Sequence, residues 1–101
     1  MITNITARHC EISEELRQRA ATVLGRFGGL VNRAVEGAVI FDVVAGISTA
    51  EIRLTGGGVA FVAKGEERDH RTALDRAEDK VRRQFDKTVQ IRRGRSAKGA
   101  A

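Results

Sequence analysis

The stretch from Thr49 to Lys64 has the pattern of two extended segments joined by glycines. Between Thr49 and Thr55 the apolar residues fall on one face of an extended chain and the charged residues on the other. Gly56–Gly58 then permits a tight turn, and Val59–Lys64 returns as a second apolar run rich in β-branched residues. The pattern predicts an antiparallel hairpin and commits the centre of the chain to a sheet.

Two segments with helical spacing are also present, at residues 14–28 and at about residues 70–90. In each, apolar residues recur three or four positions apart, as they do on one face of a helix. Ser13 and Asp69 precede these segments as candidate N-caps, and Gly28–Gly29 predicts a left-handed end to the first helix.

Two further extended segments, Ile2–Arg8 and Val35–Val44, complete the predicted order β-α-β-β-β-α. We therefore expect an α+β fold, a four-stranded mixed sheet with two helices packed on one face. A right-handed crossover would place the second strand parallel to the first. Residues 1–91 are predicted to form a single domain and residues 92–101 a basic, flexible tail. The second and fourth strands are apolar on both faces, and the sequence does not indicate what covers the outer one.

Positive charge is concentrated near the C-terminus. The chain carries 18 Lys and Arg against 13 Asp and Glu, a net charge of +5. Residues 1–79 hold ten basic and twelve acidic side chains, whereas residues 80–101 hold eight basic side chains and one acid. This asymmetry indicates a polyanionic partner, with nucleic acid ahead of an anionic membrane.

The basic residues of the second helix are predicted to lie on one side of it. On a helical wheel, Arg76, Lys80, Arg83 and Lys87 lie about 180° to 240° from Leu74, directly away from the apolar arc. This basic ridge would extend for about 16 Å, enough to follow two or three phosphates. The alternative is that these cations only complement the negative end of the helix dipole and stay solvated.

Neighbouring cations and the aromatic residues refine this prediction. Arg92 and Arg93 continue the ridge, and Arg19 and Arg26 of the first helix would widen it if the helices lie side by side. There is no Tyr or Trp, and all four Phe occupy apolar-pattern positions, so exposed rings for stacking on bases are not expected. Recognition is predicted to act through phosphates, ribose and shape, which favours structured RNA.

Other classes of protein are poorly supported. The single cysteine, Cys10, excludes an intrachain disulfide and suits a reducing cytosol, so we expect a cytoplasmic protein. No apolar run approaches the roughly 18 residues of a membrane span. His9 and Cys10 are neighbours and are expected to continue as a strand, where successive side chains point to opposite faces. With His70 they show no metal-ligand spacing, so we expect no catalysis, metal, cofactor or small-molecule substrate.

Several short segments, in their order and spacing, resemble the ribosome hibernation-promoting factors, also called sigma-54 modulation proteins or ribosome-associated inhibitors. These segments are Asn4–Thr6, Glu11–Arg17, Val62–Ala63, Ala73–Asp75 and Asp79–Lys87. The last is similar to the family's Asp-Lys-x-x-Arg-Gln-x-x-Lys helix, and the resemblance covers residues 1 to about 92. It differs at Arg71, where the family usually has an aromatic residue.

The resemblance implies a fold similar to double-stranded RNA-binding domains and an activity without catalysis. Such proteins bind the small ribosomal subunit in the channel for messenger and transfer RNA, stopping translation and preserving idle ribosomes in a stress or stationary-phase response. The implied ribosomal RNA contacts fall on Lys80, Arg82, Arg83, Gln84 and Lys87, and more loosely on Arg8 and Lys64. Without a second domain, the chain resembles a short member or the N-terminal domain of a long one.

Two alternatives from other classes stay open. The chain is also predicted to suit a stand-alone, non-specific binder of double-stranded nucleic acid, which would share the fold but not the ribosome. The other is a protein-interaction module that uses the sheet face or edge, with a homodimer as one form.

Overall fold

The computed structural model describes the backbone of residues 1–30 and 34–100 and the side chains of residues 1–29, 36–58 and 60–87. The described residues form four strands and two helices in the predicted order, which confirms the α+β class. The elements are β1 (Ile2–Ala7), α1 (Glu14–Leu30), β2 (Ala34–Val44), β3 (Ile47–Gly56), β4 (Val59–Glu67) and α2 (His70–Ala100).

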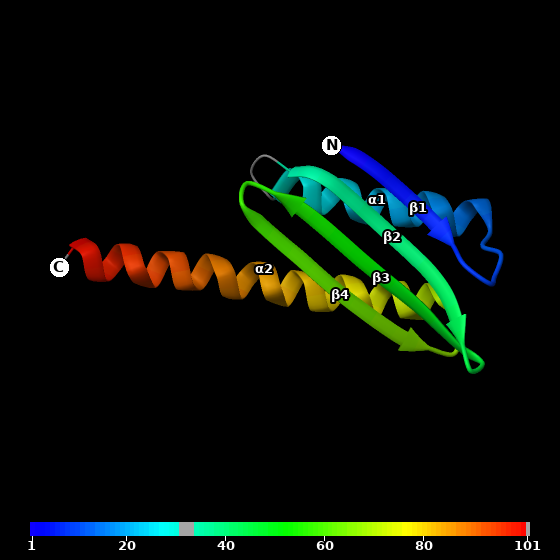
Figure 1. Cartoon of the computed structure of the whole chain (residues 1–101). Helices are drawn as coiled ribbons and strands as arrows, with labels where there is room; N and C mark the ends of the chain where they lie inside the picture. The colour runs from blue at the N-terminus through cyan, green and yellow to red at the C-terminus, as the bar shows by residue number, and fades with distance from the viewer. Residues whose placement is uncertain (31–33, 101) are drawn as a thin grey trace.

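The strands form one sheet in the order β1-β2-β3-β4 (Figure 1). β1 is parallel to β2, as predicted, because the connection through α1 is long enough for a crossover. The other two pairs are antiparallel hairpins. Their two-residue turns, Ala45–Gly46 and Gly57–Gly58, have positive φ at all four residues, which matches the twist of the strands. The first turn is tight, so β3 begins at Ile47 and not at the predicted Thr49.

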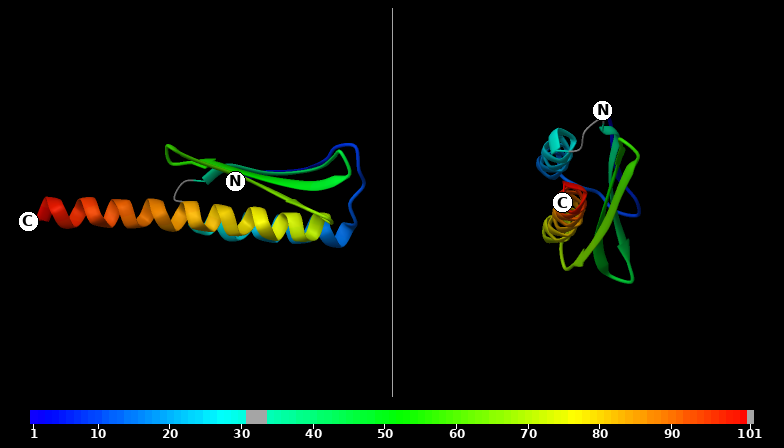
Figure 2. Two further views of the ribbon diagram at one scale, coloured as in Figure 1. Left: turned by 90° about the horizontal axis from the view of Figure 1, so that it is seen from below. Right: turned by 90° about the vertical axis from the view of Figure 1, so that its left-hand side faces the viewer.

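Both helices lie on the same face of the sheet, which gives the molecule two layers (Figure 2). The core fills the space between these layers and takes side chains from every element except β1, whose Ile5 and Ala7 pack at its margin. Its fully buried large side chains are Val23, Leu24, Phe27, Val39, Phe41, Ile52, Leu54, Leu74 and Val81. The predicted apolar stripes of both helices are therefore confirmed as the faces that contact the sheet.

The other face of the sheet is open. Among the described residues no helix covers it, and Val62, Val44 and Ile47 are each about half exposed on it. Charged side chains alternate with these apolar ones, as where Arg53 pairs with Glu51 at 3.3 Å. The described side chains on this face are therefore a mixture of apolar and charged residues.

The ends of both helices differ from the prediction. α1 continues through Gly28 and Gly29 to Leu30, and neither glycine has the positive φ of a left-handed stop. Gly28 instead leaves room for Met1, since a Cβ at Gly28 would lie 2.8 Å from the Met1 Cε. α2 extends as helix to Ala100, well past the end of the sheet, so residues 92–100 have helical backbone (Figure 1). That residues 92–101 form a flexible tail stays a prediction.

Candidate nucleic-acid interface

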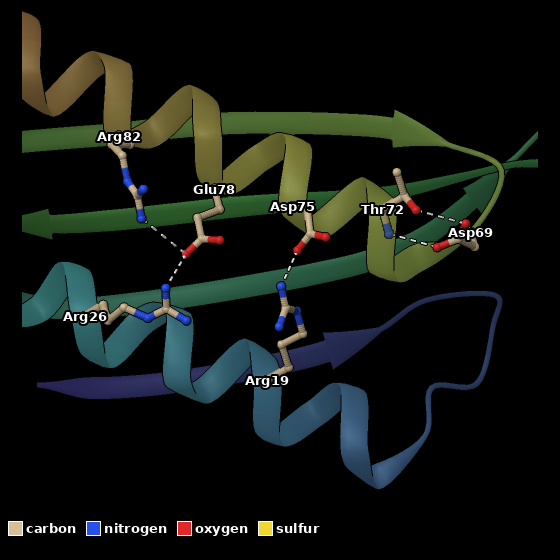
Figure 3. Close-up of polar contacts among 7 residues, drawn as sticks. All are labelled: Arg19, Arg26, Asp69, Thr72, Asp75, Glu78 and Arg82. Carbon is tan, nitrogen blue, oxygen red and sulfur yellow. Dashed lines mark hydrogen bonds and ion pairs between the residues drawn. The ribbon is translucent and has the colours of Figure 1, made fainter.

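The start of α2 is fixed by Asp69, whose carboxylate caps the helix. The Thr72 backbone N–H donates to Asp69 Oδ1 at 2.8 Å, and the Thr72 hydroxyl donates to Oδ2 at 3.0 Å (Figure 3). These bonds hold the pKa of the Asp69 carboxyl below its ordinary value, with the backbone bond as the largest cause. The predicted cap is confirmed, as is that of Ser13, whose hydroxyl accepts the Leu16 N–H at 3.0 Å.

A glycine sets how closely α2 lies on the sheet. A Cβ at Gly65 of β4 would collide with the carbonyl oxygen of Ala73 and lie 2.9 Å from the Ala77 nitrogen. The two backbones therefore meet without a side chain between them. This contact brings the side chains on one flank of α2 within reach of β4, which is an edge strand.

The four residues of the basic ridge are all exposed, but three of them already have partners. Arg76 Nε donates to Glu67 Oε1 at 2.9 Å, and Arg83 lies 2.9 Å from Asp79 one turn earlier. Lys80 donates to a backbone carbonyl, that of Lys64. Lys87 makes no ion pair with any side chain that the structure describes. Such exposed pairs are weak, and each leaves further N–H groups of the cation in solvent.

Lys80 also has a structural role that the helical wheel does not reveal. Its Nζ donates to the Lys64 carbonyl at 2.7 Å, and Gln84 Nε2 donates to the Val62 carbonyl at 2.8 Å. Val62 and Lys64 alternate with the buried residues of β4. Their carbonyls lie on the side of β4 that is not paired with β3. The side chains of Lys80 and Gln84 thus occupy backbone carbonyl groups that an exposed edge strand would otherwise offer to another chain.

The opposite edge of the sheet has a similar contact from a helix side chain. β1 is the other edge strand, and Arg17 of α1 donates from Nη1 to the Ile5 carbonyl at 3.0 Å. Long polar side chains therefore reach from each helix to the backbone of the edge strand beneath it. In the sequence, the spacing of Lys80 and Gln84, one helical turn apart, could have indicated that both reach the same strand. Which strand they reach depends on the tertiary fold.

Arg19 and Arg26 point from α1 toward α2, as expected for helices side by side, but acids of α2 meet them there (Figure 3). Arg19 Nη2 lies 2.6 Å from Asp75 Oδ1, and this hydrogen bond raises the pKa of Arg19. Arg26 Nη1 lies 3.3 Å from Glu78 Oε2. Arg82 approaches the same oxygen at 3.9 Å. We call these five residues the interhelical seam.

The remaining predicted site residues are dispersed. Lys64 is exposed on β4 and alternates with the buried Ala63, so its side chain lies on the open face of the sheet, away from the ridge. Arg8 follows β1 and is exposed, with its N–H bonded to the Phe41 carbonyl. The side chains of Arg92 and Arg93 lie outside the described residues.

His9 and Cys10 do not lie on a strand, so the prediction that a strand points their side chains to opposite faces is wrong. β1 ends at Ala7, and His9 has a φ of 56° in the connection to α1. Its Nδ1 lies 3.0 Å from Asp42 Oδ1, a contact that lowers the pKa of Asp42. Burial raises the pKa of the Cys10 thiol, which disfavours the reactive thiolate. No group of three metal-binding side chains gathers within the described part of the chain.

The described phenylalanine rings are packed inside the domain. Phe27, Phe41 and Phe61 are buried, and the partly buried Phe85 lies against Phe61 with ring centroids 6.2 Å apart. No described phenylalanine ring stands exposed for stacking on a base, whereas the His9 imidazole, in the connection after β1, is 79% exposed. No described helix is long and apolar enough to cross a membrane.

Two solved structures share this fold. A ribosomal subunit interface protein from Coxiella burnetii superimposes with a TM-score of 0.78 at 20% identity, covering 89% of this chain and 99% of its own. The N-terminal domain of Protein Y from Thermus thermophilus gives 0.72 at 23% identity, covering 86% and 97%. No curated protein sequence matches the chain. The model of the family described as sigma 54 modulation protein / S30EA ribosomal protein matches residues 3–93, and the chain therefore belongs to that family.

Proposed function

We propose that the chain binds the small ribosomal subunit in the channel for messenger and transfer RNA and thereby inhibits translation on idle ribosomes. Family membership supports an association with the ribosome. The observation that carries the proposal is the basic ridge, four exposed cations on one flank of α2 in a domain whose described phenylalanine rings are packed inside. The proposed activity is binding without catalysis.

The ridge suits phosphate recognition better than base readout. Arg83 and Lys87 are the most available of its cations, because Arg83 is held only by an exposed pair and its side chain is 78% exposed. Arg76 and Lys80 keep N–H groups beyond those used for Glu67 and the Lys64 carbonyl. Guanidinium and ammonium groups in a line, without stacking rings, favour the backbone of a folded RNA.

The other predicted residues have lesser roles in this proposal. Arg82 and Gln84 flank the ridge, and Arg92 and Arg93 extend it along the same helix. Arg19 contributes little while Asp75 holds it by a hydrogen bond of 2.6 Å, whereas Arg26 is only paired by charge with Glu78 at 3.3 Å. Arg8 and Lys64 contribute only if the bound RNA also reaches the sheet.

A single charge reversal with a matched control tests the proposal. Arg83→Glu removes a ridge cation, whereas Arg53→Glu makes the same change on the open face of the sheet. Both arginines are exposed and each pairs with one carboxylate of its own element, at 2.9 Å and 3.3 Å. We expect Arg83→Glu to weaken co-sedimentation with small subunits by about tenfold or more. Equal effects of the two variants would contradict a site on the ridge.

Competition distinguishes the ribosome from a general nucleic-acid partner. In the presence of excess RNA duplex, a ribosome-specific factor stays on the small subunit. A non-specific duplex binder, which this fold also suits, is displaced in proportion to the competitor. Displacement would favour that second candidate.

A further inference from the structure

The interhelical seam places acids where a phosphate would otherwise bind. A carboxylate on a guanidinium occupies the same N–H groups that recognise a phosphate. Asp75 takes an Nη2 N–H of Arg19 at 2.6 Å, and Glu78 lies 3.3 Å from Arg26. Both acids are on α2 and both arginines are on α1, so the pairs link the two helices (Figure 3).

Arg19 is held inward, whereas Arg26 is 53% exposed. The Arg19 side chain is only 35% exposed, and its Nε is enclosed without a hydrogen-bond partner. Glu78 is 13% exposed, and its Oε2 makes no hydrogen bond although two guanidinium groups approach it. Glu78 is therefore positioned by charge between Arg26 and Arg82, and not by a close hydrogen-bonded fork.

We propose that Asp75 and Glu78 are specificity-determining residues, which restrict binding to non-cognate RNA by neutralising Arg19 and Arg26. The contact is intramolecular, so the acids compete with any phosphate at high effective concentration. A binding site that fits the ridge is unaffected, whereas an arbitrary RNA loses the extra contacts that the seam would offer. This inference rests on the proposed function, because it presupposes a cognate site on the ridge.

The test is a double-mutant cycle on Arg19 and Asp75, with Asp86→Ala as the control. Asp86 is an exposed acid of α2 that makes no ion pair with a described side chain, so its removal changes the net charge equally. Affinity for a short RNA duplex is measured over a range of salt concentrations for the wild type, Asp75→Ala, Arg19→Gln, the double variant and the control.

We expect Asp75→Ala to steepen the dependence of log affinity on log salt by about one, the contribution of one more neutralised phosphate. Arg19→Gln should cancel that gain in the double variant and change little by itself. Asp86→Ala should tighten binding slightly without changing the slope. Equal slopes for Asp75→Ala and Asp86→Ala, or a gain that survives in the double variant, would overturn the proposal.

Two further measurements are needed to interpret the double-mutant cycle. Circular dichroism checks that each variant is folded, and Asp75→Asn, which keeps the shape of the side chain, replaces Asp75→Ala if the latter unfolds. Wild-type co-sedimentation with small subunits is measured separately. Its absence would refute the proposed function, whereas the duplex slopes alone decide on the role of the seam acids.

Discussion

Gly65 of β4 and Ala73 of α2 are in backbone contact, with no room for a side chain between them. A Cβ added at Gly65 would collide with the Ala73 carbonyl oxygen and lie 2.9 Å from the Cβ of Arg76. The position of the basic ridge over the edge of the sheet depends on this close approach, because a wider separation would take Lys80 and Gln84 away from the β4 carbonyls.

Gly65→Ala should therefore destabilise the protein strongly. The neighbouring atoms belong to the backbone and cannot move aside as a flexible side chain would, so α2 must shift. We expect a loss of about 3 kcal/mol in the free energy of unfolding, at the upper end for overpacking. Urea denaturation measures it.

Gly25→Ala is the matched control for this substitution. A Cβ at Gly25 meets nothing within 4 Å, and the residue lies inside α1. It should gain about 0.5–1 kcal/mol from helix propensity. If the two substitutions changed stability alike, the close packing at Gly65 would not be what limits the separation of α2 from β4.

The cap of α2 should make stability depend on pH. The folded-state pKa of Asp69 lies below its ordinary 3.8, so its contribution is complete above that value and is lost as pH falls through the lower, folded-state pKa. Asp69→Ala should lower the melting temperature by a few degrees at neutral pH.

Asp69→Asn separates capping from charge in this prediction. Asn is as good an N-cap as Asp but has no carboxyl to titrate. The melting curve of Asp69→Asn at pH 7 should nearly match that of the wild type. Below pH 4 the wild type should lose stability that Asp69→Asn keeps, because only the wild type has a carboxylate to protonate. A wild-type pH profile that Asp69→Asn reproduces in full would show that other groups cause the acid sensitivity.

The fold was predictable because its signals are local. Alternation around the glycine turn and the apolar stripes of the helices each depend on a few neighbouring residues, and together they gave the order and layering of the elements. The continuation of α1 through Gly28 was not predictable. A Cβ at Gly28 would lie 2.8 Å from the Met1 Cε, and a contact between residues so far apart in the sequence has no local signal. Glycine is common just after a helix but does not by itself end one.

The sequence predicted on which side of α2 the basic ridge lies, but not which groups its residues contact. The helical wheel placed Arg76, Lys80 and Arg83 away from the core, and all three are exposed. It could not place Glu67 or the Lys64 carbonyl beside them, because these lie on a strand whose distance from α2 is set by Gly65. The acids opposite Arg19 and Arg26 were likewise visible in the sequence, but not their pairing across two helices.

Lys80 and Lys87 should therefore differ when each is replaced by alanine. Both should weaken binding to small subunits, because each removes a ridge cation. Only Lys80→Ala should also cost stability, by about 1 kcal/mol, because its hydrogen bond to the Lys64 carbonyl is lost. Thermal unfolding and co-sedimentation of the two variants in parallel check this, and equal stability would argue against an edge-capping role for Lys80.

The protected edge also predicts how self-association can be induced. Lys80→Ala combined with Gln84→Ala would leave the carbonyls of Lys64 and Val62 unoccupied on an edge strand. Exposed edges pair with other chains, so the double variant should form dimers or larger species at concentrations where the wild type does not. Size-exclusion chromatography with light scattering measures the difference. The matched control is Arg83→Ala with Lys87→Ala, which removes exposed side chains of α2 that form no hydrogen bond or ion pair with the described residues of β4. If both double variants behave like the wild type, the helix side chains are not what keeps β4 from pairing.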